Sequence, residues 1–350
     1  MRCSIMKIVL LLFALLGAAI GVTAQSMAYA TPAVQASDSA PAVFAEAQRL
    51  SQQGKFDEAI AKLQVLKTQS PLPKGLEHEI GIAYYKKGDY QAASAAFEGA
   101  LKENPSDSEA TQLLGLSYYL AGKPQQAIPY LEKVQTWFPR ANVDGSYILG
   151  ICYIQSKRYD DARHAFGKMF DVPPDSASSY LFTARMLLRQ EYDPIAEEYA
   201  LKATTLDPKL PGAHFLLGEL HLYKSRIPDA ISDFQQELAL NPSYAPAYYK
   251  LADAYLRVQK YDDAEKLLQR SIWLDSTSTG PYILMGKVLQ KKGETALAVR
   301  ALQRAVAMDP NNPMTHQLLG QAYRELGQDQ QAQHELQLVQ QLNAAKEASR

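Results

Sequence analysis

The chain has 350 residues, 47% of them hydrophobic and 21% charged, a length that would ordinarily predict two domains of a soluble globular protein. Its 36 Lys and Arg against 37 Asp and Glu give a formal charge of -1, so the whole chain lacks the electrostatic signature of a nucleic-acid or anionic-membrane partner. The 21 tyrosines against 2 tryptophans and 2 cysteines favour a fold held by repeated aromatic packing rather than by disulfides or metal.

The N-terminal segment has the three parts of a secretory signal peptide. Arg2 and Lys7 precede an apolar run over residues 8–22, and small residues follow it up to Ala24. We predict cleavage after Ala24, with Ala30 as the second choice. An uncleaved membrane anchor is the alternative, but the run is shorter than the roughly 20 residues that a spanning helix needs, and two glycines interrupt it.

Removal of residues 1–24 leaves Cys152 as the only cysteine, so we expect no internal disulfide in the exported chain. Residues 25–39, rich in Ala and Ser, predict a flexible leader. We therefore expect a periplasmic or secreted protein, whose membrane contact is limited to the signal segment if that segment is retained.

From residue 40 to residue 346 the sequence repeats, with a period of 34 residues and one step of 35. A small residue, here called the anchor, recurs at this spacing: Ala47, Gly81, Gly115, Gly150, Ala184, Gly218, Ala252, Gly286 and Gly320. An alanine follows each anchor by twelve residues: Ala59, Ala93, Ala127, Ala162, Ala196, Ala230, Ala264, Ala298 and Ala332. Five units carry tyrosine three residues after the anchor: Tyr84, Tyr118, Tyr153, Tyr255 and Tyr323.

Each unit predicts two helices. Apolar residues recur at helical spacing around the anchor, and a shared glycine such as Gly88 or Gly122 is suited to the left-handed residue that ends a helix. A proline such as Pro105 stops the second helix. The small anchor and the alanine twelve residues later allow the two helices to approach closely. One hairpin cannot bury both faces alone, so neighbouring units are expected to stack into a solenoid.

This unit closely resembles the tetratricopeptide repeat. The sharpest match is Leu114-Gly115 with Tyr118, Ala127, Leu131 and Pro139. The resemblance implies an all-α fold, a right-handed superhelical α-solenoid of helix-turn-helix repeats. Its nine units span residues 40–73, 74–107, 108–142, 143–176, 177–210, 211–244, 245–278, 279–312 and 313–346, and residues 347–350 form a short tail. The additional residue falls between Pro139 and Asp144.

Repeat five departs most from the pattern. It has Thr183 where leucine is usual and Ala200 where a large apolar residue is usual. We therefore expect it to be locally thin or a site of flexing.

The sequence offers little for catalysis or metal binding. His214 and His221 are the most metal-like pair, but seven residues of helix separate them by about 10 Å, whereas zinc ligands lie about 2.0–2.1 Å from the ion. We expect both to be packing residues. No nucleophile, base and orienting group come together in the sequence, so we expect no enzyme, cofactor or metal. An enzyme with an unrecognised site is the alternative from another class of protein.

The resemblance implies that the first helices line a concave groove. Side chains three residues before the anchor and one, four and five after it would face the groove. They are Ile82, Tyr85, Leu116, Tyr119, Tyr147, Ile151, Ile154, Arg185, Arg189, Tyr223, Tyr249, Arg257 and Lys291. A contiguous exposed apolar strip of this kind usually marks a partner site. The alternative is that tightly wound neighbours bury the strip as core.

The groove changes character along the chain. Repeats two to four are apolar and are expected to bind apolar side chains of a protein or peptide partner, while the basic second half binds acidic ones. The strongest candidates share one position, five residues after the anchor: Arg189, Tyr223, Arg257 and Lys291. Expected ion pairs of Arg185 with Glu219, and of Lys287 with Asp253, would neutralise other basic positions.

We therefore expect a non-enzymatic exported scaffold that binds proteins and helps to assemble an envelope or secretion complex. A self-associating structural scaffold is the alternative, in which the glutamine-rich residues 328–345 dock on another copy and form a homo-oligomer. Nucleic acid is not expected as a partner.

Overall fold

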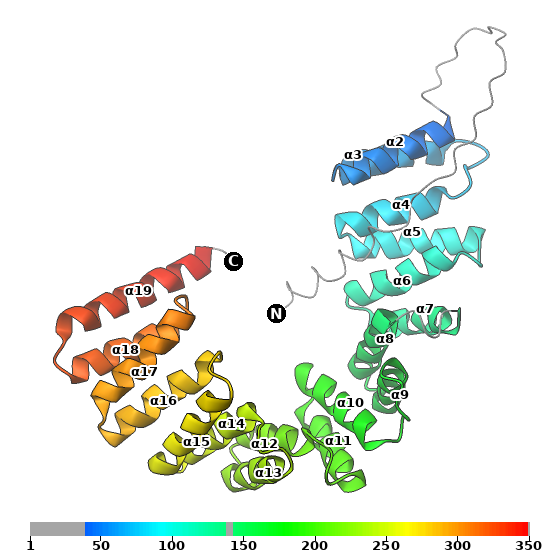
Figure 1. Cartoon of the computed structure of the whole chain (residues 1–350). Coiled ribbons are helices and arrows are strands. Elements are labelled where there is room, and N and C mark those ends of the chain that lie inside the picture. The colour runs from blue at the N-terminus through cyan, green and yellow to red at the C-terminus, as the bar shows by residue number, and fades with distance from the viewer. Residues whose placement is uncertain (1–38, 138–142, 349–350) are drawn as a thin grey trace, which may run out of the picture.

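The computed structural model describes residues 39–137 and 143–348, and its all-helical architecture confirms the predicted fold class (Figure 1). The described residues form helices α2 to α19 and one 3-10 helix, η1 (Leu66–Thr68), and they contain no strand. The predicted signal segment, residues 1–24, lies outside the described residues, as does the additional residue after Pro139. Within the described ranges, no helix has both the length and the apolar character to cross a membrane.

The helices alternate between a first and a second helix of each repeat. The first helices, which contain the anchors, are α2 (Ala40–Gln52), α4 (Leu76–Lys87), α6 (Ser108–Leu120), α8 (Val143–Gln155), α10 (Ala177–Arg189), α12 (Ala213–Tyr223), α14 (Ala245–Arg257), α16 (Thr279–Lys292) and α18 (Pro313–Glu325). The second helices are α3 (Phe56–Val65), α5 (Tyr90–Glu103), α7 (Pro124–Trp137), α9 (Tyr159–Met169), α11 (Asp193–Leu206), α13 (Ile227–Leu240), α15 (Tyr261–Leu274), α17 (Thr295–Met308) and α19 (Asp329–Ala348).

The pairs follow one another along an open arc, from α2 and α3 in blue to α18 and α19 in red (Figure 1). First helices of successive repeats touch each other, as α12 touches α14 and α14 touches α16. In the second half of the chain, α12, α14 and α16 lie on the inner side of the arc, and α13, α15 and α17 lie on its outer side (Figure 1). This part of the arc thus has an inner side made of first helices and an outer side made of second helices (Figure 1).

The anchor glycines bring the two helices of a repeat into direct contact. A Cβ atom added at Gly150 would lie 2.5 Å from the ring of Phe166, and one added at Gly218 would lie 2.6 Å from the ring of Phe234. Both rings are fully buried, and so is the alanine twelve residues after each of these anchors. The large residue of the second helix therefore occupies the space that an anchor side chain would fill.

The turn between the two helices has a left-handed residue seven positions after the anchor. Glycine occupies this position in Gly88 (φ 88°) and Gly122 (φ 73°), as the sequence predicted. Repeats four to seven have the same conformation without glycine: Lys157 (φ 59°), Glu191 (φ 65°), Ser225 (φ 58°) and Gln259 (φ 60°). The left-handed turn is thus kept in these repeats although a side chain disfavours that conformation.

Tyrosines three residues after the anchor join successive repeats by hydrogen bonds. Each hydroxyl meets a Gln or Glu on the second helix of the preceding repeat, accepting from Gln and donating to Glu. The pairs are Tyr84 with Gln64, Tyr118 with Glu98, Tyr153 with Glu132, Tyr255 with Gln235 and Tyr323 with Gln303. The tyrosine predicted to fill space beside the helices therefore also bridges two repeats.

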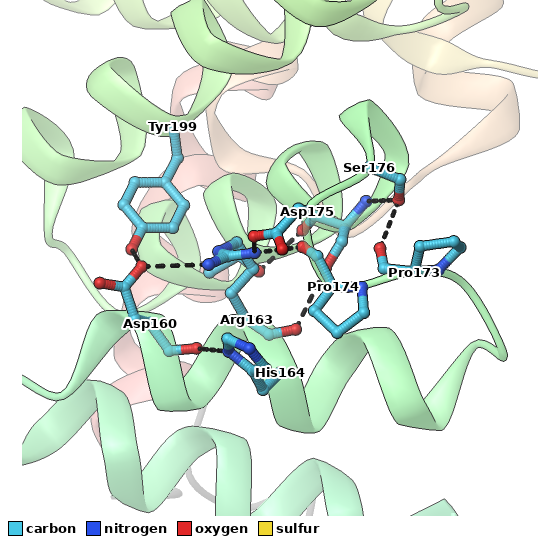
Figure 2. Close-up of polar contacts among 10 residues, drawn as sticks. Asp160, Arg163, His164, Pro173, Pro174, Asp175, Ser176 and Tyr199 are labelled. Atoms are coloured by element: carbon cyan, nitrogen blue, oxygen red, sulfur yellow. Dashed lines mark hydrogen bonds and ion pairs between the residues drawn. The ribbon is translucent and has the colours of Figure 1, made fainter.

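The junction between repeats four and five lacks this tyrosine bridge and has a polar network around the buried Arg163 instead (Figure 2). Arg163, which is 5% exposed, donates to the carbonyl oxygen of Pro174 and to Asp175 Oδ1 at 2.6 Å. The Tyr199 hydroxyl donates to Asp160 Oδ1 at 3.1 Å, and the same oxygen lies 3.4 Å from Arg163 Nη2. These contacts connect α9, α11 and the segment before α10.

The same arginine lies beside aromatic rings of repeat five. The guanidinium of Arg163 lies 4.6 Å from the centre of the Tyr180 ring, which in turn lies 5.3 Å from the ring of Tyr199. Thr183 and Ala200, the two residues that depart from the repeat pattern, are both fully buried. The divergent positions of repeat five therefore lie in its core.

Replacing Gly218 with alanine is expected to lower the free energy of unfolding by about 1–3 kcal/mol, because the new methyl group would press against the buried Phe234 ring. Gly320→Ala is the matched control, since a Cβ there meets its nearest heavy atoms at an ordinary 3.4 Å. That control should keep its stability or gain up to about 1 kcal/mol from helix propensity. Urea unfolding followed by circular dichroism measures both, and equal losses in the two variants would contradict the close-contact explanation.

Candidate functional site

The apolar half of the predicted groove is mostly core. Leu116, Ile151 and Ile154, expected to face the groove, are 9%, 2% and 0% exposed. They belong to one continuous hydrophobic cluster that runs from repeat two into repeat six. The expectation of an open apolar strip is therefore wrong for these three side chains, because they pack into this cluster instead of facing solvent.

The aromatic residues of the same half are partly covered. Ile82, Tyr85, Tyr119 and Tyr147 are half-buried and pack against that cluster. Burial raises the pKa of Tyr85 to about 12 and also raises the pKa of Tyr119. In repeats two to four the inner surface is therefore largely packed, and its aromatic rings are only partly exposed.

The basic half of the groove is more open. Arg189, Arg257 and Lys291 are exposed, and Tyr223 is 74% exposed although it is a large aromatic residue. The four occupy the same position in α10, α12, α14 and α16, so they follow the inner side of the arc. Arg185 and Tyr249, also predicted for the groove, are half-buried. Burial raises the pKa of Tyr249.

A hollow of about 320 Å³ lies between the inner helices α10, α12 and α14. Its lining residues are Leu188, Glu219, Leu222, Tyr223, Lys250, Asp253 and Arg257. Tyr223 and Arg257, both candidates from the sequence, thus meet at one hollow. The Arg257 guanidinium also donates to the carbonyl oxygen of Leu222 at 3.4 Å, which ties α14 to α12.

The ion pairs at this hollow differ from the expected ones. Glu219 pairs with Lys250 Nζ at 2.9 Å rather than with Arg185, and Asp253 pairs with Arg257 at 3.1 Å rather than with Lys287. Lys250 was missed because it stands two residues before the anchor, a position that the family resemblance does not assign to the groove. Arg257 and Asp253 are i and i+4 partners on one helix, a spacing that the sequence does show.

A second polar cluster, which the sequence did not predict, holds the end of α12. His221 Nδ1 lies 2.6 Å from Asp233 Oδ2 on α13, and His221 Nε2 lies 3.4 Å from Glu197 Oε1 on α11. Glu197 also accepts hydrogen bonds from Lys224, at 2.5 Å, and from Arg226. The turn that follows Tyr223 is thus fastened to the preceding repeat.

The same cluster settles how the two histidines pack. His214 Nδ1 lies 3.9 Å from Asp233 Oδ1, so one carboxylate stands between His214 and His221. The His214 Nε2 atom lies 3.2 Å from the carbonyl oxygen of Pro208. Across the described part of the chain, no group of His, Cys, Asp and Glu side chains is arranged as a metal site.

Burial and neighbouring charges shift the pKa values of the carboxyl groups in this cluster in opposite directions. Burial raises the pKa of Asp233, although the nearby His221 opposes the rise. Burial would also raise the pKa of Glu197, but hydrogen bonds from Lys224 and Arg226 outweigh it and lower that pKa to about 2. Glu197 is therefore a carboxylate whose ionised form the fold strongly favours.

Cys152 lies in the core of the solenoid. Cys152 is fully buried on α8, and burial raises the pKa of its thiol to about 12. Reactive cysteines have lowered pKa values and solvent access, so Cys152 lacks the features of a nucleophile.

Comparison with known proteins agrees with the repeat pattern. Four family models, each described as tetratricopeptide repeat, match residues 78–142 and 215–281, 118–184, 280–312 and 301–334. Together these matches cover more than half of the chain. None of the curated proteins matches it.

Several solved structures are similar over part of the chain. A crystal structure of MamA is 22% identical over 47% of this chain and 96% of its own, with a TM-score of 0.44. MamA 41-end from Desulfovibrio magneticus RS-1 is 21% identical over 49% of this chain and 97% of its own, with a TM-score of 0.46. YrrB, titled a TPR protein with an unusual peptide-binding site, is 20% identical over 51% and 93%, with a TM-score of 0.44. These likenesses are too distant to transfer a function.

Glu197→Gln is expected to make the free energy of unfolding depend less on pH in the acid range. The folded pKa of Glu197, about 2, lies below the ordinary value of 4.5. The contribution of ionised Glu197 to the free energy of unfolding is therefore fully present above about pH 4.5 and is lost as the pH falls from there towards 2. At neutral pH the variant should lose roughly 1–3 kcal/mol, the range for hydrogen bonds to charged groups.

Thermal unfolding at pH 7 and at pH 3 measures this difference. The adjacent Glu198→Gln is the matched control, because Glu198 is exposed and should keep the wild-type pH dependence. A stability difference between Glu197→Gln and wild type that is as large at pH 3 as at pH 7 would contradict the assignment.

Proposed function

Because the chain belongs to the tetratricopeptide repeat family, we propose that it is a protein-binding scaffold whose inner surface in repeats five to eight holds an acidic segment of a partner protein. The observation that carries this proposal is Tyr223, a large aromatic side chain 74% exposed at the edge of the hollow between α10, α12 and α14. Exposed aromatic residues beside a hollow are typical anchors of protein interfaces.

The charge of the partner follows from the residues in line with Tyr223. Arg189, Arg257 and Lys291 are exposed at the equivalent position of the flanking inner helices. Carboxylates of an extended segment along the inner surface would meet these cations in turn. Arg257 is already paired with Asp253, so an acidic ligand would compete with, or bridge to, an existing ion pair. Arg189 and Lys291 therefore supply most of the charge complementarity.

The burial of apolar residues in repeats two to four supports placing recognition in repeats five to eight. Leu116, Ile151 and Ile154 are buried, so repeats two to four offer ring edges rather than an apolar channel. Their role in the proposal is to fix the curvature of the inner surface, while recognition resides in repeats five to eight.

Export is a second part of the proposal. The basic start, the apolar run over residues 8–22 and the small residues up to Ala24 support it. A scaffold of this kind, exported without a catalytic site, would assemble or tether an envelope or secretion complex.

Selection from a random peptide library displayed on phage tests the binding surface. Peptides enriched on the full chain should be rich in Asp and Glu. Arg189→Glu combined with Lys291→Glu should weaken their binding at least tenfold, because charge repulsion replaces attraction. Tyr223→Ala should weaken binding to a similar extent, because an aromatic anchor is lost.

Lys86→Glu is the matched control for these variants. Lys86 is exposed at the same repeat position, but in repeat two. It should leave peptide affinity unchanged in fluorescence polarisation. Enrichment of peptides without acidic residues, or equal losses for Lys86→Glu and the double variant, would contradict the proposed site.

The export proposal predicts a mature N-terminus at Gln25. Mass spectrometry of the protein recovered from the exporting host should find peptides that begin at Gln25 or, by the second choice, at Thr31. Recovery of an intact N-terminus at Met1 would show that the segment is retained.

A further inference from the structure

An exposed basic cluster lies on the outer surface of repeats seven and eight. On α15, Lys266, Arg270 and Trp273 follow one another at helical spacing, and on α17 Arg300 and Arg304 take the positions equivalent to Lys266 and Arg270 one repeat later. All five side chains are exposed, and Trp273 is 72% exposed. We propose that these five residues, the outer basic cluster, dock on the surface of an anionic lipid bilayer.

The cations of the cluster are available for a partner. Within residues 39–137 and 143–348, none of the four forms an ion pair. Asp262 and Glu265 of the same helix share one cation, Lys292, at 2.9 Å and 2.6 Å, and Lys292 also pairs with Glu294 at 3.0 Å. Hydrogen bonding from Lys292 and the nearby charge of Lys266 lower the pKa of Asp262. The four cations of α15 and α17 stand against the three carboxylates of α15, so the excess positive charge comes from Arg300 and Arg304 of α17, which has no acidic residue.

The indole is placed to enter the headgroup region. The guanidinium of Arg270 lies 4.2 Å from the centre of the Trp273 ring, so charge and aromatic surface are presented together. Tryptophan is enriched at membrane interfaces, where its ring enters the headgroup region and its N–H stays hydrated. Lys and Arg near an anionic bilayer are attracted to its surface potential.

The position on the arc favours a bilayer over a peptide. In Figure 1, α15 and α17 lie on the outer, convex side of the arc, so the surface that they form is not positioned to enclose an extended chain. A fluid lipid surface can adapt to such a curve. Docking here would leave the inner surface facing away from the membrane and free to bind protein, so this inference is independent of the proposed function.

The charge is local to these two helices. The neighbouring outer helix α13 contains neither Lys nor Arg, and the whole chain has a formal charge of -1. The sequence expectation of membrane contact through the signal segment alone followed from the whole-chain sum, which hides this cluster.

Fluorescence of Trp273 provides a direct test with the full chain. Trp137 is the other tryptophan, so Trp137→Phe leaves Trp273 as the single reporter. Vesicles of phosphatidylcholine with about 30% phosphatidylglycerol should shift its emission to shorter wavelength, and pure phosphatidylcholine vesicles should not. The N-terminal apolar segment is far from this reporter in sequence and would bind both kinds of vesicle.

Vesicle co-sedimentation gives the energetic test. Arg270→Glu with Arg304→Glu should weaken binding to the anionic vesicles roughly tenfold or more, and added salt should weaken wild-type binding in the same direction. Lys202→Glu is the matched control, since Lys202 is exposed at the position of α11 that corresponds to Arg270. Circular dichroism should show equal helix content in all variants.

Three results would overturn the proposal. The first is an unshifted Trp273 emission on anionic vesicles, and the second is equal vesicle binding by wild type and the double variant. The third is a Trp273 shift with polyglutamate but none with anionic vesicles, which would assign the cluster to an acidic protein.

Discussion

The close approach of the two helices of a repeat at its small anchor is the contact on which the rest of the molecule depends. At Gly150 and Gly218 a buried phenylalanine ring lies where an anchor side chain would begin, so a larger anchor would press the two helices apart. The anchors Ala47, Ala184 and Ala252 are buried at the same position. Each hairpin packs at its anchor, and the stacking of such hairpins forms the continuous solenoid on which Tyr223 is exposed.

Two kinds of junction join the repeats. Tyrosine hydroxyls bridge five of them, as Tyr323 does with Gln303. The other three have Leu187, His221 or Leu289 at that position, and charged groups contribute instead: Arg163 packs on Tyr180 and Asp160 accepts a hydrogen bond from Tyr199, Glu197 pairs with Lys224, and Lys292 pairs with Glu265. Two of these three junctions flank repeat five, the repeat with the most divergent sequence. Leu188 of that repeat lines the open hollow, so the divergence and the candidate site are neighbours in space.

The sequence predicted the hairpins, the close approach of their helices and the shared position of Arg189, Tyr223, Arg257 and Lys291, because each depends on spacing within one repeat. It could not predict how much of the strip is covered. Ile154 is fully buried in a cluster that runs from repeat two into repeat six, and such burial depends on the stacking of whole repeats. The Glu197 cluster was equally out of reach, because its partners lie 24 to 29 residues away, on α12 and in the turn that follows it, and no periodicity relates them. The cations of α15 and α17 can be found in the sequence, but only the structure shows that they are exposed and that both helices lie on the outer side of the arc (Figure 1).

The two kinds of junction also limit how the array can change in length. A tyrosine on one repeat matches a Gln or Glu on the repeat before it, so repeats that carry this matched pair could be duplicated or deleted with every hydrogen bond restored at the new boundary. Repeats five and six do not have that freedom, because Glu197 in repeat five needs His221, Lys224 and Arg226 in repeat six. Their boundary is therefore fixed, as is the boundary that Lys292 and Glu265 hold between repeats seven and eight. Gain or loss of repeats would alter the reach of the arc while leaving the hollow beside Tyr223 intact.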